Sequence, residues 1–169
     1  LVEHDAQRGL DSDYALICYG GNDSDYDWAA IAADPEGDHQ PHTKRETFRQ
    51  TLDSILKVLY RQGVQPVLMS LPPIDPRRYL RFICRNGLDR NAIMRWLGDE
   101  DMIYRHQELY SDTVTELAYA NGVPLIHVRQ AFLADHHMND LLSADGIHLT
   151  MDGYGKLFDT LADWLRPKL

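Results

Sequence analysis

Three short apolar runs, separated by long stretches with helical periodicity, constrain the fold of this chain more than any other feature. The runs are YALICY (14–19), PVLMS (66–70) and PLIHV (124–128). The first stops at two glycines and the second is followed by a double proline. Short apolar runs with such boundaries are typical of buried strands. Strands that alternate with helices form a parallel sheet covered on both faces, so we expect an α/β domain.

The segments between the runs indicate where helices begin and end. Thr43 and Glu46 have the spacing of a capping box, which predicts a helix start there, and Asp89 is a candidate N-cap. Residues 20–42, rich in Asp, Pro, Gly and His, are expected to form one long loop, and such loops are usually functional. We expect one helix over 43–63 and two short helices within 75–98. Further helices are expected over about 101–120, near Ala131 and over about 150–165.

Composition limits the class of protein and its partners. The 169 residues are 44% hydrophobic and 25% charged, as in one globular domain, which we place at 1–169. A formal charge of -9 disfavours nucleic acid or an anionic membrane as a partner, and no apolar run suits membrane insertion. Cys18 and Cys84 form no metal or redox motif and are expected to be buried thiols, and a cytoplasmic location is the default expectation.

Two short motifs carry side chains suited to chemistry. GGND (20–23) directly follows the first predicted strand, at the end where parallel sheets place their sites. DGIH (145–148) precedes the last helix. Asp145 can turn back and accept a hydrogen bond from the Nδ1–H group of His148, which leaves Nε2 as a base. A lone D-x-x-H is more often a surface cap with a loop histidine, but its combination with GGND indicates a site.

With these motifs in this order, and a helix after the histidine, the chain resembles the SGNH hydrolases, also called GDSL esterases and lipases. The resemblance covers nearly the whole chain and is closest to a bacterial branch with GGNDSDYDW, PVLMSLPPIDPRRY, WLGD and DGIH. It implies a three-layer α/β/α, flavodoxin-like fold with a five-stranded parallel sheet. It also implies cleavage of carboxylic esters through an acyl-enzyme, without metal or cofactor.

The resemblance also assigns roles to residues. His148 would be the general base and then the general acid, Asp145 would orient it, and Asn22 would donate to the oxyanion. The N–H group of Gly20 would be a further donor. Small residues at Gly20 and Gly21 let the loop bend sharply and let the substrate approach the backbone. The substrate is left open among an acetylated sugar, a short-chain ester and a lysolipid.

The acidic stretch after GGND has two interpretations. Its D-x-D-x-D spacing imitates the first half of a calcium loop, but Trp28 stands where the sharp turn needs glycine. We favour a site rim, in which Asp23 holds the loop and the rings of Tyr26 and Trp28 pack or line the cavity. Four arginines at helical spacing, Arg77, Arg78, Arg81 and Arg85, suit either an anionic substrate group or, as we favour, a solvated face with acidic partners.

The nucleophile that the resemblance implies is missing from these residues. That serine lies in a G-D-S block, which does not occur here, and the block with a second oxyanion donor is also absent. Ser12 follows GLD but precedes the strand that leads to Asn22, so we reject it. Only three of the five strands are readable, and without its neighbour the first strand would have a bare edge. We therefore expect the first two strands and the serine in a segment upstream of Leu1 that complements this chain.

Two rival functions remain open at this stage. The same fold could be a non-catalytic module that binds a carbohydrate or an acyl group, and a fluorophosphonate probe would discriminate, since labelling requires an activated serine. The acidic loop could instead serve a metal-dependent phosphoesterase, which a chelator would inhibit.

Overall fold

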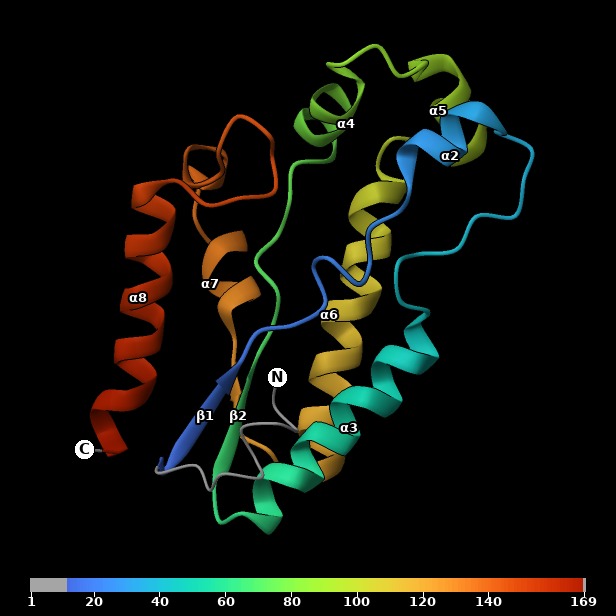
Figure 1. Ribbon diagram of the computed structural model, residues 1–169. Helices are drawn as coiled ribbons and strands as arrows, with labels where there is room; N and C mark the ends of the chain where they lie inside the picture. Colours follow the sequence, from blue (N-terminus) through green and yellow to red (C-terminus); the bar gives the residue numbers. More distant parts are fainter. Residues whose placement is uncertain (1–11, 169) are drawn as a thin grey trace.

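The computed structural model describes residues 12–168 and contains a three-stranded parallel sheet (Figure 1). The strand order is β1-β2-β3, and both neighbouring pairs are parallel, which confirms the predicted class of fold. The strands are β1 (Tyr14–Ile17), β2 (Gln65–Met69) and β3 (Leu125–Ile126). β1 and β3 are shorter than their apolar runs, β2 is as long as its run but begins one residue earlier, and all three strands end before their runs do.

Helices follow the strands and account for most of the chain. They are α2 (Trp28–Ala33), α3 (Arg45–Arg61), α4 (Pro76–Cys84), α5 (Arg90–Leu97), α6 (Met102–Asn121), α7 (Val128–Leu133), α8 (Met151–Leu165) and the 3₁₀ helices η1 (Met138–Leu141) and η2 (Arg166–Lys168). Asp89 caps α5 as predicted, since its side chain accepts from the N–H groups of Asn91 and Ala92. Within residues 12–168, no helix is both long and apolar enough to cross a bilayer.

Two local predictions about helices are wrong. Thr43 does not cap α3: the N-cap is Lys44, and the Glu46 side chain instead accepts from Gln50. The backbone N–H group of Thr43 is not available to the Glu46 side chain, because it donates to the carbonyl of Asp23. The carbonyl of Thr43 accepts from the Tyr110 hydroxyl. The predicted loop 20–42 is also interrupted by α2, which the side chain of Asp27 caps.

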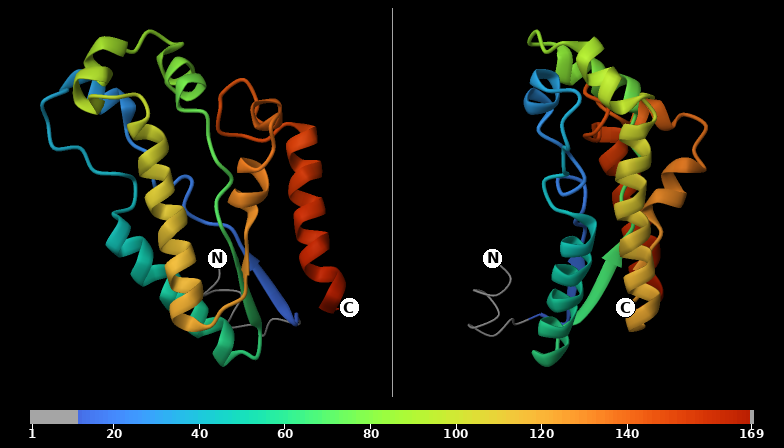
Figure 2. Two further views of the ribbon diagram at one scale, coloured as in Figure 1. Left: turned by 180° about the vertical axis from the view of Figure 1, so that it is seen from behind. Right: turned by 90° about the vertical axis from the view of Figure 1, so that its right-hand side faces the viewer.

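The helices cover both faces of the sheet around the central strand β2. Helices α3 and α6 pack on one face with Leu68, and α7 and α8 pack on the other with Val67; both of these side chains are fully buried. Figures 1 and 2 show these two layers and the strands pointing toward the end of the molecule where α2, α4 and α5 lie. A third apolar cluster there joins α2, α4, α5 and the start of α6, and it forms the wall of the site described below.

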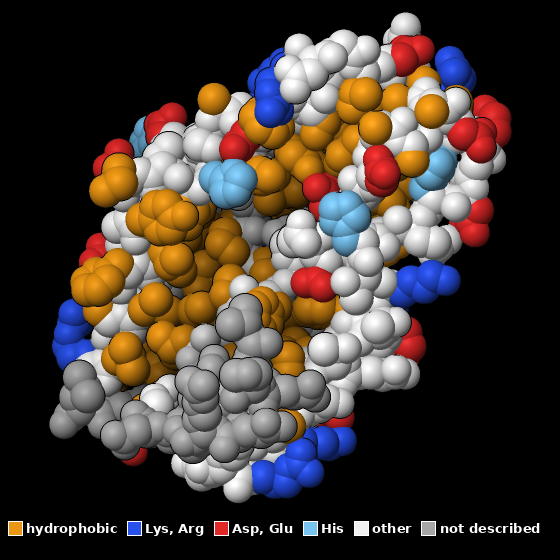
Figure 3. Space-filling view, in the orientation of Figure 1, with side chains coloured by type: hydrophobic (Ala, Val, Ile, Leu, Met, Phe, Trp, Pro, Cys, Tyr) orange, Lys and Arg blue, Asp and Glu red, His pale blue; other side chains and the backbone are white. Residues whose placement is uncertain are grey.

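Among residues 12–168, exposed apolar side chains gather on β1 and α8. In β1, Ile17 faces the core, but Leu16 is 43% exposed, and no strand among residues 12–168 pairs with the outer edge of β1. On α8, Phe158 is 70% exposed. We call this area the β1–α8 face; its exposed members are Tyr14, Leu16, Met151, Tyr154 and Phe158. Figure 3 shows the apolar side chains gathered over these two elements.

Candidate active site

A cavity of about 480 Å³ lies at the carboxyl ends of β1 and β2. Its walls come from the loop after β1, the loop after β2, helices α2, α4 and α5, the start of α6 and the loop before α8. Asn22 and His148, 126 positions apart in the chain, both line it. Figure 3 shows the hollowed face with apolar side chains exposed in it. The two predicted motifs therefore converge on one cavity.

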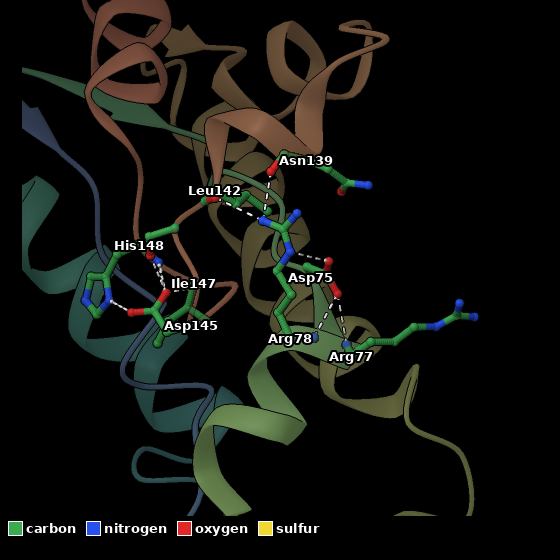
Figure 4. Close-up of polar contacts among 9 residues, drawn as sticks. Asp75, Arg77, Arg78, Asn139, Leu142, Asp145, Ile147 and His148 are labelled. Atoms are coloured by element: carbon green, nitrogen blue, oxygen red, sulfur yellow. Dashed lines mark hydrogen bonds and ion pairs between the residues drawn. The ribbon is translucent and has the colours of Figure 1, made fainter. Parts of the chain in front are cut away.

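Asp145 and His148 form a tight pair at the rim (Figure 4). Oδ2 of Asp145 lies 2.7 Å from Nδ1 of the His148 ring, in agreement with the predicted hydrogen bond. Oδ1 accepts from the hydroxyl of Ser143 at 2.6 Å and from the backbone N–H groups of Ile147 and His148 at 3.0 Å. The ring is thus held through Nδ1, which leaves Nε2 available to act on a proton.

The environment of Asp145 keeps its carboxyl group ionised. Partial burial raises its pKa, but the hydrogen bonds from Ser143, from the backbone and ring of His148 and from Ile147 together lower that pKa well below the usual range. A carboxylate of this kind accepts the Nδ1–H group, selects the tautomer with a free Nε2, and stabilises the ring when Nε2 gains a proton.

The loop that carries this pair is anchored on α4. Nη1 of Arg78 donates to the carbonyls of Asn139 and Leu142 at 2.8 and 3.0 Å, and its Nε lies 3.2 Å from Oδ2 of Asp75 (Figure 4). The backbone N–H group of Asp75 donates to the carbonyl of Gly146 at 2.8 Å. Gly146 has φ +82°, and a Cβ there would lie 2.6 Å from the Asp75 carbonyl oxygen, so only glycine fits.

The predicted row of four arginines does not form one substrate-binding surface. Arg77 pairs with Glu100, Arg78 holds the loop, and Arg85 stacks on the ring of Phe82. The favoured prediction, a helix face with acidic partners, is confirmed for two of them: Arg77 pairs with Glu100, and Arg78 pairs with Asp75. The sequence did not identify Arg78 as a neighbour of the Asp145 loop, because the contact joins residues more than sixty positions apart.

The Asn22 loop is fixed through its backbone. Gly20 has φ +124°, a backbone conformation that favours glycine, and a Cβ there would make a tight contact, 3.1 Å from Cδ1 of Leu71. The Gly20 carbonyl accepts from the N–H group of Ser24, whose hydroxyl donates to the Gly21 carbonyl. The amide group of Asn22 has no hydrogen-bond partner among residues 12–168, so it is free to donate to a ligand.

The predicted aromatic rim lines the cavity from a buried position. Tyr26 and Trp28 are each 7% exposed. The Trp28 Nε1–H group donates to Oδ1 of Asp25 at 2.8 Å, the Tyr79 hydroxyl donates to Oδ2, and the Tyr26 hydroxyl is paired with Nδ1 of His106. Burial raises the pKa of Tyr79 most, followed by its hydrogen bond to Asp25 and the charge of that carboxylate. Burial lowers the pKa of His106, so both groups are neutral near pH 7.

The acidic stretch does not gather its carboxylates at one point. The Asp25 carboxylate accepts from Trp28 and Tyr79, and that of Asp27 caps α2. Asp23 lines the cavity, and its backbone carbonyl accepts from the N–H group of Thr43, twenty positions away; the loop-holding role expected of Asp23 stays a prediction. Across residues 12–168, no three side chains of His, Cys, Asp or Glu are placed to share a metal ion.

None of the serine hydroxyl groups reaches the imidazole ring. All six hydrogen-bond elsewhere: Ser12 with Tyr14, Ser24 with Gly21, Ser54 with Gln50, Ser70 with Ile126, Ser111 with Leu71 and Ser143 with Asp145. The prediction of two buried thiols is wrong, because Cys18 is exposed and lines the cavity and Cys84 is half-buried.

Solved structures of similar fold are hydrolases and are longer than this chain. A lipase/acylhydrolase from Enterococcus faecalis is 18% identical, with a TM-score of 0.63 over 93% of this chain and 63% of that one. An α/β hydrolase from the metagenome of Lake Arreo, Spain, is 22% identical, with a TM-score of 0.62 over 96% of this chain and 66% of that one. A catalytic mutant of an acetylxylan esterase from Geobacillus stearothermophilus is 18% identical, with a TM-score of 0.59 over 89% and 58%.

These structural similarities establish the shared fold. The chain spans about two thirds or less of the length of each of the three proteins. No curated protein matches the chain. The family model described as the GDSL-like Lipase/Acylhydrolase family matches residues 1–156, which include both GGND and DGIH. With this match, the parallel fold and the longer neighbours, the chain belongs to the GDSL-like lipase/acylhydrolase family.

Proposed function

We propose that the protein hydrolyses carboxylic esters as a serine acylhydrolase. The observation that carries the proposal is the convergence of the unpartnered Asn22 amide and the Asp145-held ring of His148 on one cavity. Nε2 of His148 takes the proton of the attacking serine and then gives it to the leaving alcohol. The Asn22 amide and the N–H group of Gly20 donate to the carbonyl oxygen as it becomes an anion.

In this proposal a further segment of the protein supplies the serine. The outer edge of β1 offers unpaired backbone groups, and the β1–α8 face offers exposed apolar side chains to a strand and its following helix. A parallel strand beside β1 would end at the same rim as the Asn22 loop. The greater length of the structural neighbours leaves room for such a segment.

The proposed mechanism predicts that His148→Ala abolishes hydrolysis by the full-length protein. Without the imidazole the serine has no base, so kcat for p-nitrophenyl acetate should fall by about 10⁴-fold or more. The exposed histidine His136, replaced by Ala, is the matched control and should retain wild-type turnover. Unchanged turnover in His148→Ala would reject the mechanism.

The alternative function, a carbohydrate- or acyl-binding module without turnover, is decided by the same assay. If the wild-type protein binds esters but releases no p-nitrophenol above the solvent rate, the binding module replaces the hydrolase.

A further inference from the structure

Two residues that precede α3 hold the Asn22 loop from a distant part of the chain. The backbone N–H group of His42 donates to the carbonyl of Asp25 at 2.8 Å, and that of Thr43 donates to the carbonyl of Asp23 at 3.1 Å. In addition, Nδ1 of the His42 ring lies 3.1 Å from the carbonyl oxygen of Asn22. Adjacent residues thus make three hydrogen bonds to one turn about twenty positions earlier in the sequence.

The contact with the Asn22 carbonyl determines which nitrogen of His42 carries a proton. A carbonyl oxygen can only accept, so Nδ1 of the ring must be protonated and must donate. The same oxygen also accepts from the backbone N–H group of Asp25 at 3.2 Å. Both lone pairs of the Asn22 carbonyl are therefore used, and the ring of His42 supplies one of the two donors.

The backbone that carries His42 is itself fixed by the core. The carbonyl of the next residue, Thr43, accepts from the hydroxyl of Tyr110 on α6. The ring of Tyr110 contacts that of Phe48 on α3, with the ring centroids 5.2 Å apart, and both residues are buried. Because two packed helices hold this point, His42 can transmit their rigidity to the Asn22 loop.

The Asn22 amide depends on such support. It has no hydrogen-bond partner of its own among residues 12–168, so its position follows from the backbone of the loop. An oxyanion donor has to lie about 2.7–3.1 Å from the charged oxygen. A displacement of about 1 Å can cost on the order of a hundredfold in rate.

Resting on the proposed function, we infer that His42 is a positioning residue for Asn22. Its Nδ1–H group holds the Asn22 backbone carbonyl and thereby keeps the side-chain amide directed at the oxyanion. His42 does not line the cavity, so it acts through Asn22 and does not touch the substrate. Changes at His42 should therefore affect the transition state more than substrate binding.

Substitutions in the full-length protein separate the ring contact from the backbone contacts. His42→Ala removes the ring but keeps the N–H group that donates to Asp25, and it should lower kcat for p-nitrophenyl acetate about tenfold with little change in KM. His42→Asn should retain most of the wild-type kcat, because its amide nitrogen is attached to Cγ, as Nδ1 is in histidine. His42→Gln, with its donor one bond further out, should resemble His42→Ala.

His39 provides the matched control. It belongs to the same loop and its ring is also bonded to a backbone carbonyl, that of Asp34 at 2.6 Å, but it makes no contact with the Asn22 loop. His39→Ala should keep kcat near the wild-type value. Equal losses of kcat in His39→Ala and His42→Ala, or a loss that His42→Asn does not restore, would overturn the inference.

A double-mutant cycle tests whether His42 acts through Asn22. In an Asn22→Ala background the donor is already gone, so the further change His42→Ala should alter kcat by less than about twofold. If the tenfold loss persists in that background, His42 acts independently of Asn22 and the inference is wrong.

Nuclear magnetic resonance of the full-length protein tests the contact without any need for turnover. At about pH 9, where imidazole rings are neutral, ¹⁵N spectra should show the proton of His42 on Nδ1. In His42→Ala the order parameter of the Asn22 backbone N–H group should fall from about 0.85 toward 0.6. A proton on Nε2, or an unchanged order parameter, overturns the inference even if esters are hydrolysed. Both expected spectra without hydrolysis by the wild type would reject the proposed function and keep the positioning contact.

Discussion

Asn22 is the residue whose chemistry depends most on its backbone. The glycines before it allow the turn, and Ser24 fixes that turn through two hydrogen bonds, while the Asn22 amide remains unpartnered among residues 12–168. A donor that is held in place before the reaction does not have to reorient when the transition state forms, so it lowers the activation free energy.

Loss of the Asn22 donor should therefore lower kcat rather than substrate binding. In the full-length protein, Asn22→Ala should reduce kcat for an ester by about 10²–10³-fold and change KM little. Asn22→Asp, which keeps the size but replaces the donor by a negative charge, should be at least as damaging. The exposed Asn86→Ala is the matched control. A rise in KM with kcat unchanged would show that Asn22 only binds substrate.

At the residue scale, the sequence predicted those contacts that are local. The bond between Asp145 and His148 joins residues three apart, and the spacing predicted it. The pairing of Tyr26 with His106, and that of Tyr79 with Asp25, join distant segments, and no periodicity of the chain encodes them. The catalytic roles of Asn22, Asp145 and His148 stay predictions until the variants are measured.

At the scale of elements, the loop from η1 to His148 depends on helix α4. Arg78 bridges two carbonyls of that loop and the carboxylate of Asp75, and only a guanidinium group reaches all three. We regard Arg78 as a positioning residue for His148.

Arg78→Ala should loosen the loop and lower kcat by about ten- to a hundredfold, since small displacements of a catalytic group are costly. Arg78→Lys should restore little of the lost kcat, because an ammonium group does not bridge the same carbonyls. The neighbouring Arg77→Ala, which removes an exposed pair with Glu100, is the control and should stay near wild type. Equal loss of kcat in the Arg77 and Arg78 variants would refute a specific positioning role.

The order and type of the elements followed from the sequence, but several boundaries did not. Periodicity predicted α3, α6 and α8 because each must bury one apolar stripe. It missed α2, which is short and is held by the third apolar cluster. The run 124–128 yielded a strand of two residues, because Val128 begins α7.

At the scale of the whole molecule, the β1–α8 face is the feature that most needs a partner. Monomeric proteins rarely leave large rings and an open strand edge together in water. The proposed serine-bearing segment would cover both.

Whether a further segment covers the β1–α8 face can be tested by measuring the free energy of unfolding. In the full-length protein, Phe158→Asp should lower the free energy of unfolding by about 3 kcal/mol or more, because a charge would enter a covered apolar contact. Tyr119, equally exposed at 71% but on α6, is the matched control, and Tyr119→Asp should change stability by less than about 0.5 kcal/mol. Equal and small effects at both positions would mean that the β1–α8 face stays in water.

Labelling of the full-length protein with a fluorophosphonate, followed by mass mapping of the adduct, tests the central claim most directly. The account predicts one labelled serine, outside the six in this chain, and loss of labelling in His148→Ala, because Nε2 activates that serine. An adduct on Ser24 or another serine of this chain, or labelling that survives in His148→Ala, would contradict it.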